Sequence, residues 1–406
     1  MFSRITLENF FSFRGPTTVK LNPGLNILLG INGSGKSNLL KAIQLLYQAI
    51  IGNGLEYIFL KTWGGFPTVA NFNANEKDYI KLSFEFDKEF INNIKNQKGY
   101  QFRENPIYEL TIYKMASTSY WLAEKLYSIS PSSTQDDFIF MEMNNAQGVI
   151  SKRREDGKVR LEKYPEQNQE ITFKSTEPAL SQISDPERFY PLFTLKRALE
   201  SAAVYSNFDT TFSSLIRQPA SYSTETTLLP NGQNLITILN RIKNNNSLDY
   251  EKIEEAIKKI NPFFKDINFD VIGSKLYLVL REKNLTRSVS IEQISDGTLQ
   301  YLLLLSILFN PERGNLVCLD EPETNLHPDM INTVAEALKQ ASKETQIILT
   351  THSPLLLNLF ELEDVLVFEK NQGNETVVNY SFPDEVDEDF LVGQAWLQGL
   401  IGGKRW

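Results

Sequence analysis

The chain has 406 residues, of which 41% are hydrophobic and 22% are charged. These fractions are typical of globular proteins, so the composition excludes a wholly disordered chain, and the length predicts two or three domains. The 41 basic and 50 acidic residues give a formal net charge of −9, which argues against a protein that coats nucleic acid regardless of its sequence. The single cysteine, Cys318, excludes a disulfide framework and a metal site made of several cysteines.

The sequence carries no signal for a membrane or for secretion. Its longest apolar run, residues 301–309, is interrupted by Ser306 and is far shorter than the ~20 residues that span a bilayer. The first residues do not combine a basic stretch with an apolar one, as a secretory signal does. We therefore expect a cytoplasmic protein that makes no membrane contact.

The N-terminal part of the chain predicts strands, a glycine-rich loop and a helix in succession. Residues 2–7 and 17–21 read as two strands joined by a turn, and the apolar run 25–29 is typical of a buried strand. Residues 36–50 carry apolar side chains at helical spacing. The glycines between this strand and this helix therefore lie at a strand-to-helix junction.

Farther along, the signals change from strand to helix and then alternate. Residues 77–175 read mostly as strands, with a hairpin over 151–163. That hairpin holds six Lys or Arg residues and three acidic ones, so its surface is either solvated or in contact with phosphates. Residues 176–262 favour helices. From residue 300 onward strands and helices alternate, which indicates a parallel sheet.

The glycine-rich junction fits the phosphate-loop pattern G-x-x-x-x-G-K-S, as Gly30-Ile-Asn-Gly-Ser-Gly-Lys-Ser37. Glycines let backbone N–H groups turn onto the β- and γ-phosphates of a nucleotide, and the positive end of the following helix points there. Lys36 would neutralise the phosphate charge, and the Ser37 hydroxyl would help coordinate Mg²⁺. The predicted nucleotide-binding residues of this loop are Gly30, Asn32, Gly33, Ser34, Gly35, Lys36, Ser37 and Asn38.

A second segment ends a predicted core strand in two carboxylates. Residues 316–319 are apolar, and Asp320 and Glu321 follow them. Ligands of α/β sheets bind at the carboxyl ends of the strands, so both acids are placed for chemistry. Asp320 would hold Mg²⁺ through water. Glu321 would orient and deprotonate the water that attacks the γ-phosphate.

Two histidines lie near predicted strand ends. The apolar stretch 346–351 ends at His352, which could contact the γ-phosphate from the end of its strand. His327 lies six residues after Glu321, within the sequence Glu-Thr-Asn-Leu-His-Pro. It could make a contact in a dimer or cap a local helix, and the sequence leaves both interpretations open.

A fourth segment, Ser295-Asp296-Gly297-Thr298, precedes a predicted helix at 301–308. A serine and a glycine at the start of a helix leave backbone N–H groups and the helix dipole available to an anion. We therefore predict that Ser295 and Gly297 also bind nucleotide.

The order of the four segments is informative. They follow one another as phosphate loop, Ser-Asp-Gly-Thr, Leu-Asp-Glu-Pro and Thr-His-Ser-Pro, and this order resembles the ABC-type ATPases of the RecF, SMC and overcoming-lysogenization-defect (OLD) group. The stretch Asp320-Glu-Pro-Glu-Thr-Asn-Leu-His-Pro328 looks most like the OLD-like branch, many members of which serve bacterial anti-phage systems. The stretch from Ile5 to Phe13 is similar to the first strand of the group. The resemblance covers roughly residues 1–50 and 290–370.

The resemblance implies an α/β fold: an ABC-type P-loop ATPase head, with a mixed sheet, a parallel α/β core and an inserted β and helical lobe. The expected domains are the N-terminal part of the ATPase at 1–175, a helical lobe at 176–262 and the C-terminal part at 263–406.

The resemblance also implies a role for each segment. The phosphate loop would be Walker A, residues 295–300 the signature and residues 323–328 the dimer loop. Asp320 and Glu321 would be Walker B with the catalytic glutamate, and His352 the switch histidine.

In this group, two subunits hold two ATP molecules head to tail, and the signature of one subunit closes on the phosphates of the other. We therefore expect an ATPase that uses ATP and Mg²⁺ and forms a homodimer or a higher homo-oligomer. It would be the sensor or motor of an anti-phage system with a separate effector, a nuclease or a toxin. Direct DNA contact stays open. So do two alternatives, a RecF-like DNA-repair ATPase and a scaffold in which ATP joins subunits with negligible turnover.

Three features depart from the group. No glutamine loop can be placed in residues 51–290. The chain between Lys36 and Ser295 is too short for the long coiled coil of SMC proteins and has no heptad pattern. The 54 residues after His352 are too few for the TOPRIM nuclease domain of OLD proteins, and for this reason we expect the effector to be a separate protein.

Overall fold

The computed structural model of the chain describes residues 1–74, 76–94, 99–116, 118–132, 136–165, 173–380 and 391–402. Its internal contacts form two compact units. The first unit contains Met1–Pro23, Gly30–Ala202 and Val367–Tyr380, and the second contains Gly24–Leu29, Ala203–Leu366 and the described part of Ser381–Trp406. The division into 1–175, 176–262 and 263–406 that the sequence favours stays a prediction.

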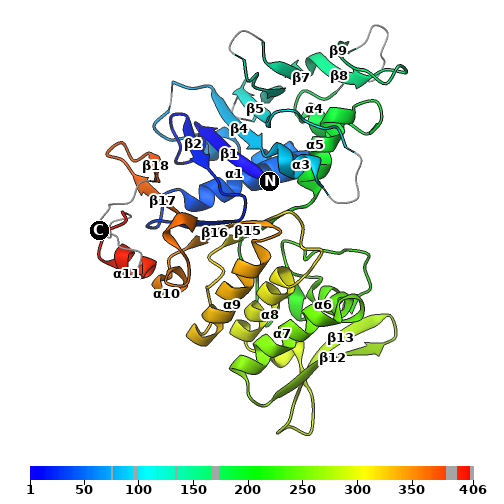
Figure 1. Ribbon diagram of the computed structural model, residues 1–406, viewed down its shortest axis with the longest axis vertical. Coiled ribbons are helices and arrows are strands. Elements are labelled where there is room, and N and C mark those ends of the chain that lie inside the picture. The colour runs from blue at the N-terminus through cyan, green and yellow to red at the C-terminus, as the bar shows by residue number, and fades with distance from the viewer. Residues whose placement is uncertain are drawn as a thin grey trace. The chain divides into compact units, whose positions relative to one another are not determined.

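An antiparallel sheet of eight strands forms the centre of the first unit (Figure 1). The strands across the sheet are β2 (Thr17–Lys20), β1 (Phe2–Glu8), β4 (Tyr79–Phe86), β5 (Pro106–Lys114), β6 (Tyr120–Ser128), β7 (Phe138–Asn144), β8 (Gln147–Arg153) and β9 (Val159–Tyr164). Side chains of β4 and β6 alternate strictly between buried and partly exposed, because successive residues of a strand point to opposite faces. One face of the sheet therefore covers a core and the other faces solvent.

The predicted hairpin is confirmed as β8 and β9, in which Arg153 pairs with Val159 across a turn that contains Gly157. Gly157 has a φ of 76°, a conformation that glycine adopts without steric cost. Two of the hairpin's arginines pair with its own acids, Arg154 with Glu162 and Arg160 with Asp156. These pairs within the hairpin, with both arginines exposed, favour a solvated hairpin.

The helices of the first unit are α1 (Lys36–Ile50), η1 (Glu56–Thr62, a π-helix), α2 (Phe66–Val69), α3 (Lys88–Asn92), α4 (Ala179–Gln182) and α5 (Tyr190–Glu200). Helix α1 buries the apolar side chains whose spacing predicted it, among them Leu39, Ile43 and Leu46. The strands β17 (Val365–Lys370) and β18 (Thr376–Asn379) pair as a hairpin, which belongs to this unit from Val367 onward.

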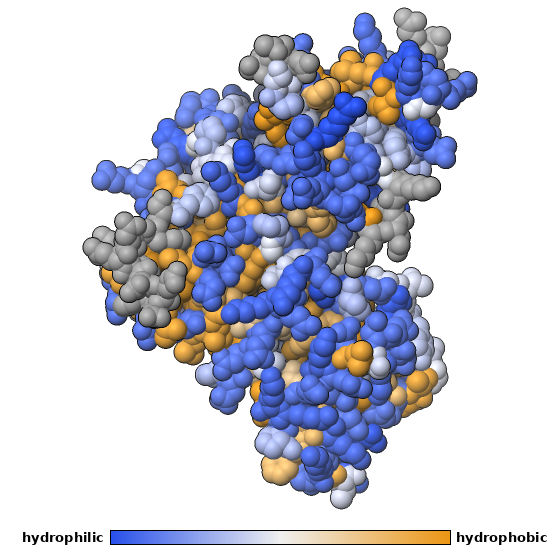
Figure 2. All heavy atoms as spheres, viewed as in Figure 1, coloured by the Kyte–Doolittle hydropathy of each residue, from blue (hydrophilic) through white to orange (hydrophobic). Residues whose placement is uncertain are grey.

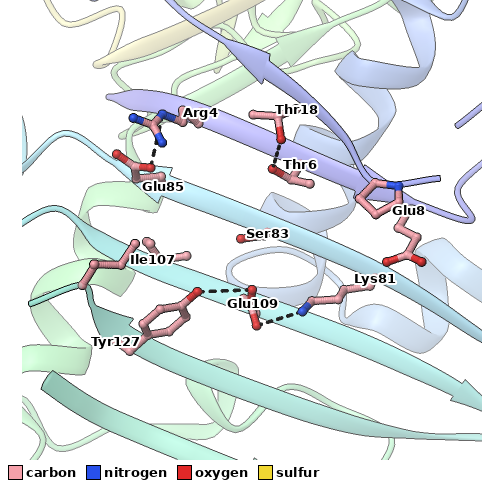
Figure 3. Close-up of a pocket in the computed structure, with 12 residues that line it drawn as sticks. Arg4, Thr6, Glu8, Thr18, Lys81, Ser83, Glu85, Ile107, Glu109 and Tyr127 are labelled. Atoms are coloured by element: carbon pink, nitrogen blue, oxygen red, sulfur yellow. Dashed lines mark hydrogen bonds and ion pairs between the residues drawn. The ribbon is translucent and has the colours of Figure 1, made fainter. Parts of the chain in front are cut away.

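The solvent face of the eight-stranded sheet has a shallow hollow of about 350 Å³ (Figure 3). Charged side chains on its floor bind one another: Arg4 pairs with Glu85, and Glu109 accepts from both Lys81 and Tyr127. These polar side chains occupy the alternate positions that the strand pattern leaves on the solvent face.

Three parallel strands form the core of the second unit, in the order β15 (Leu316–Asp320), β16 (Gln346–Thr351) and β3 (Leu25–Leu29). All residues of β16 and β3 are buried, as expected for a parallel sheet covered on both faces. Helix α9 (Pro328–Ala341) connects β15 with β16. This arrangement confirms the parallel sheet predicted for the C-terminal part of the chain.

A second, antiparallel sheet contains β11 (Ala220–Ser221), β13 (Lys275–Glu282), β12 (Phe264–Ile272) and β14 (Val289–Ser290). The other elements that follow residue 201 are β10 (Ala202–Tyr205), η2 (Leu215–Arg217), α6 (Leu235–Asn245), α7 (Ser247–Ile260), η3 (Ile291–Gln293), α8 (Asp296–Leu308), α10 (Pro354–Leu357), η4 (Leu362–Asp364) and α11 (Val392–Leu397). Helix α7 buries Tyr250, Ile253 and Ile257 on one face, and Figure 2 shows mostly hydrophilic residues over this helix. The short strands β10 and β11 interrupt the region 176–262, which the sequence predicts as mainly helical.

The C-terminal tail is a helix that packs on its own unit. The amide N–H of Gly393 in α11 donates to Oδ1 of Asn358 over 2.8 Å, and Trp396 is buried. A methyl group at Gly393 would overlap the carbonyl oxygen of Pro354 in α10. Among the described residues, no helix is both long and apolar enough to cross a bilayer.

Candidate functional site

The phosphate loop lies between β3 and α1 and has a backbone that requires glycine. Gly33 and Gly35 have φ values of 79° and 108°, where a side chain is strained. A methyl group at Gly35 would also overlap the hydroxyl oxygen of Thr376, and one at Gly30 would overlap the carbonyl oxygen of Phe368. The loop therefore keeps bare backbone at the positions where a phosphate needs close approach.

Lys36 carries the positive charge of the loop. Its Nζ donates to the carbonyl oxygens of Gly30 over 2.7 Å and of Ile31 over 3.1 Å, and the side chain is buried. The N-cap of α1, Gly35, offers no side-chain hydrogen bond to the first turn of the helix. A lysine and an uncapped helix N-terminus together form an anion site. The buried hydroxyl of Ser34 has no hydrogen-bond partner among the described residues.

Two segments that are distant in the sequence form hydrogen bonds with the phosphate loop and with the start of α1. The hydroxyl of Thr376 donates to the carbonyl oxygen of Ser34 over 2.7 Å, and its oxygen also lies within hydrogen-bond distance of Oγ of Ser12, at 2.7 Å. Nδ2 of Asn38 also donates to Oγ of Ser12, over 2.8 Å. Asn38, which the sequence assigns to the nucleotide, is thus bound to Ser12. Sequence reasoning missed Ser12 and Thr376 because neither belongs to a recognisable motif.

In the second unit, Thr350 binds at the two acids that the resemblance assigns to Walker B. Asp320 and Thr350 are register partners at the ends of β15 and β16. The Thr350 hydroxyl donates to Oδ1 of Asp320 over 2.5 Å and accepts from the backbone N–H of Glu321 over 2.9 Å. One hydroxyl therefore fixes the carboxylate of Asp320 and the backbone that carries Glu321.

Glu321 and His352 face each other at this strand edge. Oε1 of Glu321 lies 3.1 Å from Nε2 of His352, and the two side chains are 41% and 28% exposed. Glu321 has a φ of 48°, an unusual conformation for a residue with a side chain, and such conformations cluster at functional sites. The geometry presents a carboxylate and an imidazole side by side, both open to solvent.

The carboxylate of Glu323 holds the backbone of His352. One carboxylate oxygen, Oε1, accepts from the hydroxyl of Thr351 and from the backbone N–H of His352 at 3.1 Å. The other oxygen is buried without a hydrogen-bond partner among the described residues, and burial raises the pKa of Glu323. The resemblance assigns Glu323 to the dimer loop, and no sequence pattern predicts this contact.

The pairing of β3 with β16 relates Glu321 and His352 to the phosphate loop along the chain. Leu29, the last residue of β3, pairs with Thr351 of β16, and Gly30 is the next residue of the chain. The carboxyl ends of β15, β16 and β3 share one edge, because the three strands run parallel. Open α/β sheets bind ligands at this edge.

The two segments that the resemblance assigns to the signature (residues 295–300) and the dimer loop (residues 323–328) contact each other within the second unit. Ser295 caps α8 by accepting from the N–H of Thr298 over 3.2 Å. A methyl group at Gly297 would lie 2.7 Å from the carbonyl oxygen of Asn325, so this contact also requires glycine. His327 is the N-cap of α9 and accepts from the N–H of Asp329, which is the local-capping interpretation of this histidine.

The described residues contain no group of three or more His, Cys, Asp or Glu side chains that could hold a metal ion alone. Ser37 and Asp320 each carry a side-chain oxygen of the kind that Mg²⁺ prefers, and their assignment to a metal stays a prediction. Cys318 is buried in β15, and burial raises the pKa of its thiol, so it behaves as a core residue.

A protein-family model described as "AAA domain, putative AbiEii toxin, Type IV TA system" matches residues 25–358, which is more than half of the chain. The chain belongs to this AAA-domain family. Over 412 residues it is 23% identical to the "Retron Ec83 probable ATPase" of Escherichia coli, covering 91% of this chain and 71% of that protein. It is 28% identical over 127 residues to the "Retron Vc95 probable ATPase" of Vibrio cholerae, covering 28% of this chain and 24% of that protein.

The fold of this AAA-domain protein is also found in a solved structure. The crystal structure of the SmcHead bound to the C-winged helix domain of ScpA superposes with a TM-score of 0.56 at 14% identity, covering 93% of this chain and 97% of that chain. The protein therefore has the fold of an ABC-type ATPase head. The predicted fold class and the resemblance to the RecF, SMC and OLD group are both confirmed.

Proposed function

We propose that this protein binds ATP at the phosphate loop and hydrolyses it with the acids and the histidine at the carboxyl edge of the parallel strands. The observation that carries the proposal is the loop itself, in which three glycines and Lys36 form an anion site directly after β3. The loop follows directly on β3, and β3 pairs with β16, the strand that ends one residue before His352. Membership of an ATPase family supports the same assignment.

Each predicted site residue has a role in this proposal. Residues 30–38 bind the phosphates through backbone N–H groups and Lys36, and Ser37 with Asp320 would hold Mg²⁺. The bound ion would neutralise phosphate charge. Ser295 and Gly297 at the N-terminus of α8 bind the phosphates of a second subunit's ATP, as in a head-to-tail homodimer.

Glu321 is the proposed general base. Its carboxylate takes a proton from the water that attacks the γ-phosphate in line. Thr350 fixes the backbone of Glu321, and His352 holds one carboxylate oxygen, so the free oxygen is directed to the water. Lys36 and the signature of the opposing subunit stabilise the charge that develops on the phosphate oxygens.

We further propose that the ATPase is the sensor or motor of a bacterial anti-phage system and acts through a separate effector. Two relatives are retron ATPases by name, and the family description refers to a toxin system. The effector would be a nuclease or a toxin that responds to the ATP state.

The test combines biochemistry with identification of the partner. Purified protein with ATP and Mg²⁺ should release phosphate. Mass spectrometry of proteins that co-purify from the native operon should find the effector. Phosphate release without any effector, and strongly stimulated by gapped DNA, would support a repair ATPase instead.

A further inference from the structure

A buried arginine outside the recognised motifs holds the segment that leads into the signature. Arg217 ends η2 and is 3% exposed. Its guanidinium donates to five backbone carbonyls on two segments, those of Thr210, Thr211, Ile291, Glu292 and Ile294. An arginine can bind several acceptors in a fixed plane because its donors form a rigid fork. Arg217 therefore fixes the turn that immediately precedes Ser295.

The same guanidinium also binds the second residue of the signature. Nη2 of Arg217 lies 2.6 Å from Oδ1 of Asp296, the first residue of α8. The Asp296 side chain is 60% exposed, whereas that of Arg217 is 3% exposed. A buried cation thus holds an anion that lies at the surface.

The ion pair between Arg217 and Asp296 matters because the signature is proposed to face the phosphates of a second subunit's ATP. The N-terminus of α8 would approach the triphosphate of the opposing subunit, and Asp296 carries a negative charge at that end. An unneutralised carboxylate beside phosphates would be repelled, since like charges brought together at an interface cost free energy. Arg217 neutralises this carboxylate.

We propose that Arg217 is a positioning residue for the signature: it neutralises Asp296 and fixes the turn before Ser295, so that α8 can accept the phosphates of a second subunit's ATP. The inference rests on the proposed function, because it needs ATP-driven closure of two subunits. It goes further by assigning that closure to a residue 79 positions away from the signature acid.

The experiment uses the full chain in a Glu321→Gln background, in which ATP should hold the dimer closed. Sedimentation with ATP and Mg²⁺ measures the dissociation constant of the dimer. We expect Arg217→Met to weaken the dimer about tenfold or more, because a charge-assisted bond is lost and Asp296 is left unneutralised. Asp296→Asn alone should change the constant by less than about threefold. The double variant should regain the part of the affinity that was lost through the unneutralised charge, whereas the part that depends on the fixed turn stays lost.

Rescue by Asp296→Asn separates charge neutralisation from a merely structural role. A double variant as weak as Arg217→Met alone would overturn the neutralising role of Arg217. Arg241→Met is the matched control, because Arg241 makes an exposed ion pair with Glu312 in the same unit and should leave the dimer unchanged. If Arg217→Met does not fold, Arg217→Gln, which removes the charge but keeps an amide donor, takes its place.

A second readout keeps the two proposals distinguishable. Failure of the Glu321→Gln parent to dimerise with ATP would contradict the proposed function. Amide hydrogen exchange of the nucleotide-free protein still tests the positioning role. Exchange in residues 291–300 should rise in Arg217→Met and stay unchanged in Arg241→Met. Unchanged exchange in the Arg217 variant would overturn the inference.

Discussion

Nε2 of His352 lies 3.1 Å from Oε1 of Glu321, across the ends of two neighbouring parallel strands. The backbone of each of these two residues is fixed by a separate contact. Thr350 holds the N–H of Glu321, and Glu323 holds the N–H of His352. The carboxylate and the imidazole therefore form a fixed pair, and the chemistry proposed for Glu321 depends on both.

Replacement of Glu321 by glutamine should stop hydrolysis while leaving nucleotide binding intact. The amide keeps the shape of the side chain but cannot take a proton from water, and general bases contribute about 10²–10⁴-fold to rate. We expect phosphate release to fall by at least about a hundredfold and the ATP-bound dimer to accumulate. Phosphate release and light scattering with ATP measure the two effects.

Glu251→Gln, at an exposed position of α7, is the control for this substitution and should behave as the parent protein. Rapid turnover in Glu321→Gln would remove Glu321 from the role of general base.

Lys36→Ala should abolish tight nucleotide binding. The ammonium is held against the carbonyl oxygens of Gly30 and Ile31, where it would meet the β- and γ-phosphates. Lys41→Ala is the matched control on the same helix, because the Lys41 ammonium lies over the ring of Phe11, 4.5 Å from its centroid. Equilibrium dialysis with labelled ATP should show loss of binding in the first variant and retention in the second. Equal affinities would contradict the phosphate-loop assignment.

The sequence could predict the parts of the candidate site that depend on local spacing. The phosphate loop, the acids that end β15 and the histidine after β16 each follow an apolar strand, so a contiguous pattern identifies them. The fold class follows from the order of the same segments. What these features share is that their geometry is set within a few residues of the chain.

The supporting contacts could not be predicted, because their partners come from distant parts of the chain. Thr376 meets Ser12 across 364 positions, and Arg217 meets Asp296 across 79. Glu323 lies within a recognised segment, yet its contact with Thr351 depends on the register of two strands. No local spacing encodes such pairings, so they become visible in the folded chain alone.

Gly297→Ala should destabilise the second unit and weaken ATP-driven dimerisation together. The added methyl group would lie 2.7 Å from the carbonyl oxygen of Asn325, closer than normal contact, so α8 or the dimer loop must shift. Such overpacking costs about 1–3 kcal/mol. Gly15→Ala is the control, because a methyl group there has open space. Thermal unfolding and sedimentation with ATP compare the two variants, and an unchanged melting temperature in Gly297→Ala would refute the close contact.

The burial of Glu124 predicts that the stability of the first unit depends on pH. It lies on β6, accepts from the hydroxyl of Tyr108 over 2.7 Å and from the N–H of Ala179 over 2.6 Å, and is 5% exposed. Burial raises its pKa from 4.5 to about 7, despite these two donors. The folded protein therefore holds a proton on Glu124 at pH values where the unfolded chain has released it.

Because the folded pKa is raised, Glu124 favours folding most below pH 4.5, and its contribution decreases as pH rises toward about 7. Above that pH the cost of the buried charge is constant, at up to about 3 kcal/mol. Glu124→Gln removes the ionisation while its amide can still accept from Ala179 and donate to Tyr108. The variant should therefore be more stable than the parent at pH 8, and the difference should shrink or reverse at pH 5. Denaturant unfolding of both proteins at the two pH values measures this, and parallel pH profiles would show that Glu124 is ionised in the folded state across the range.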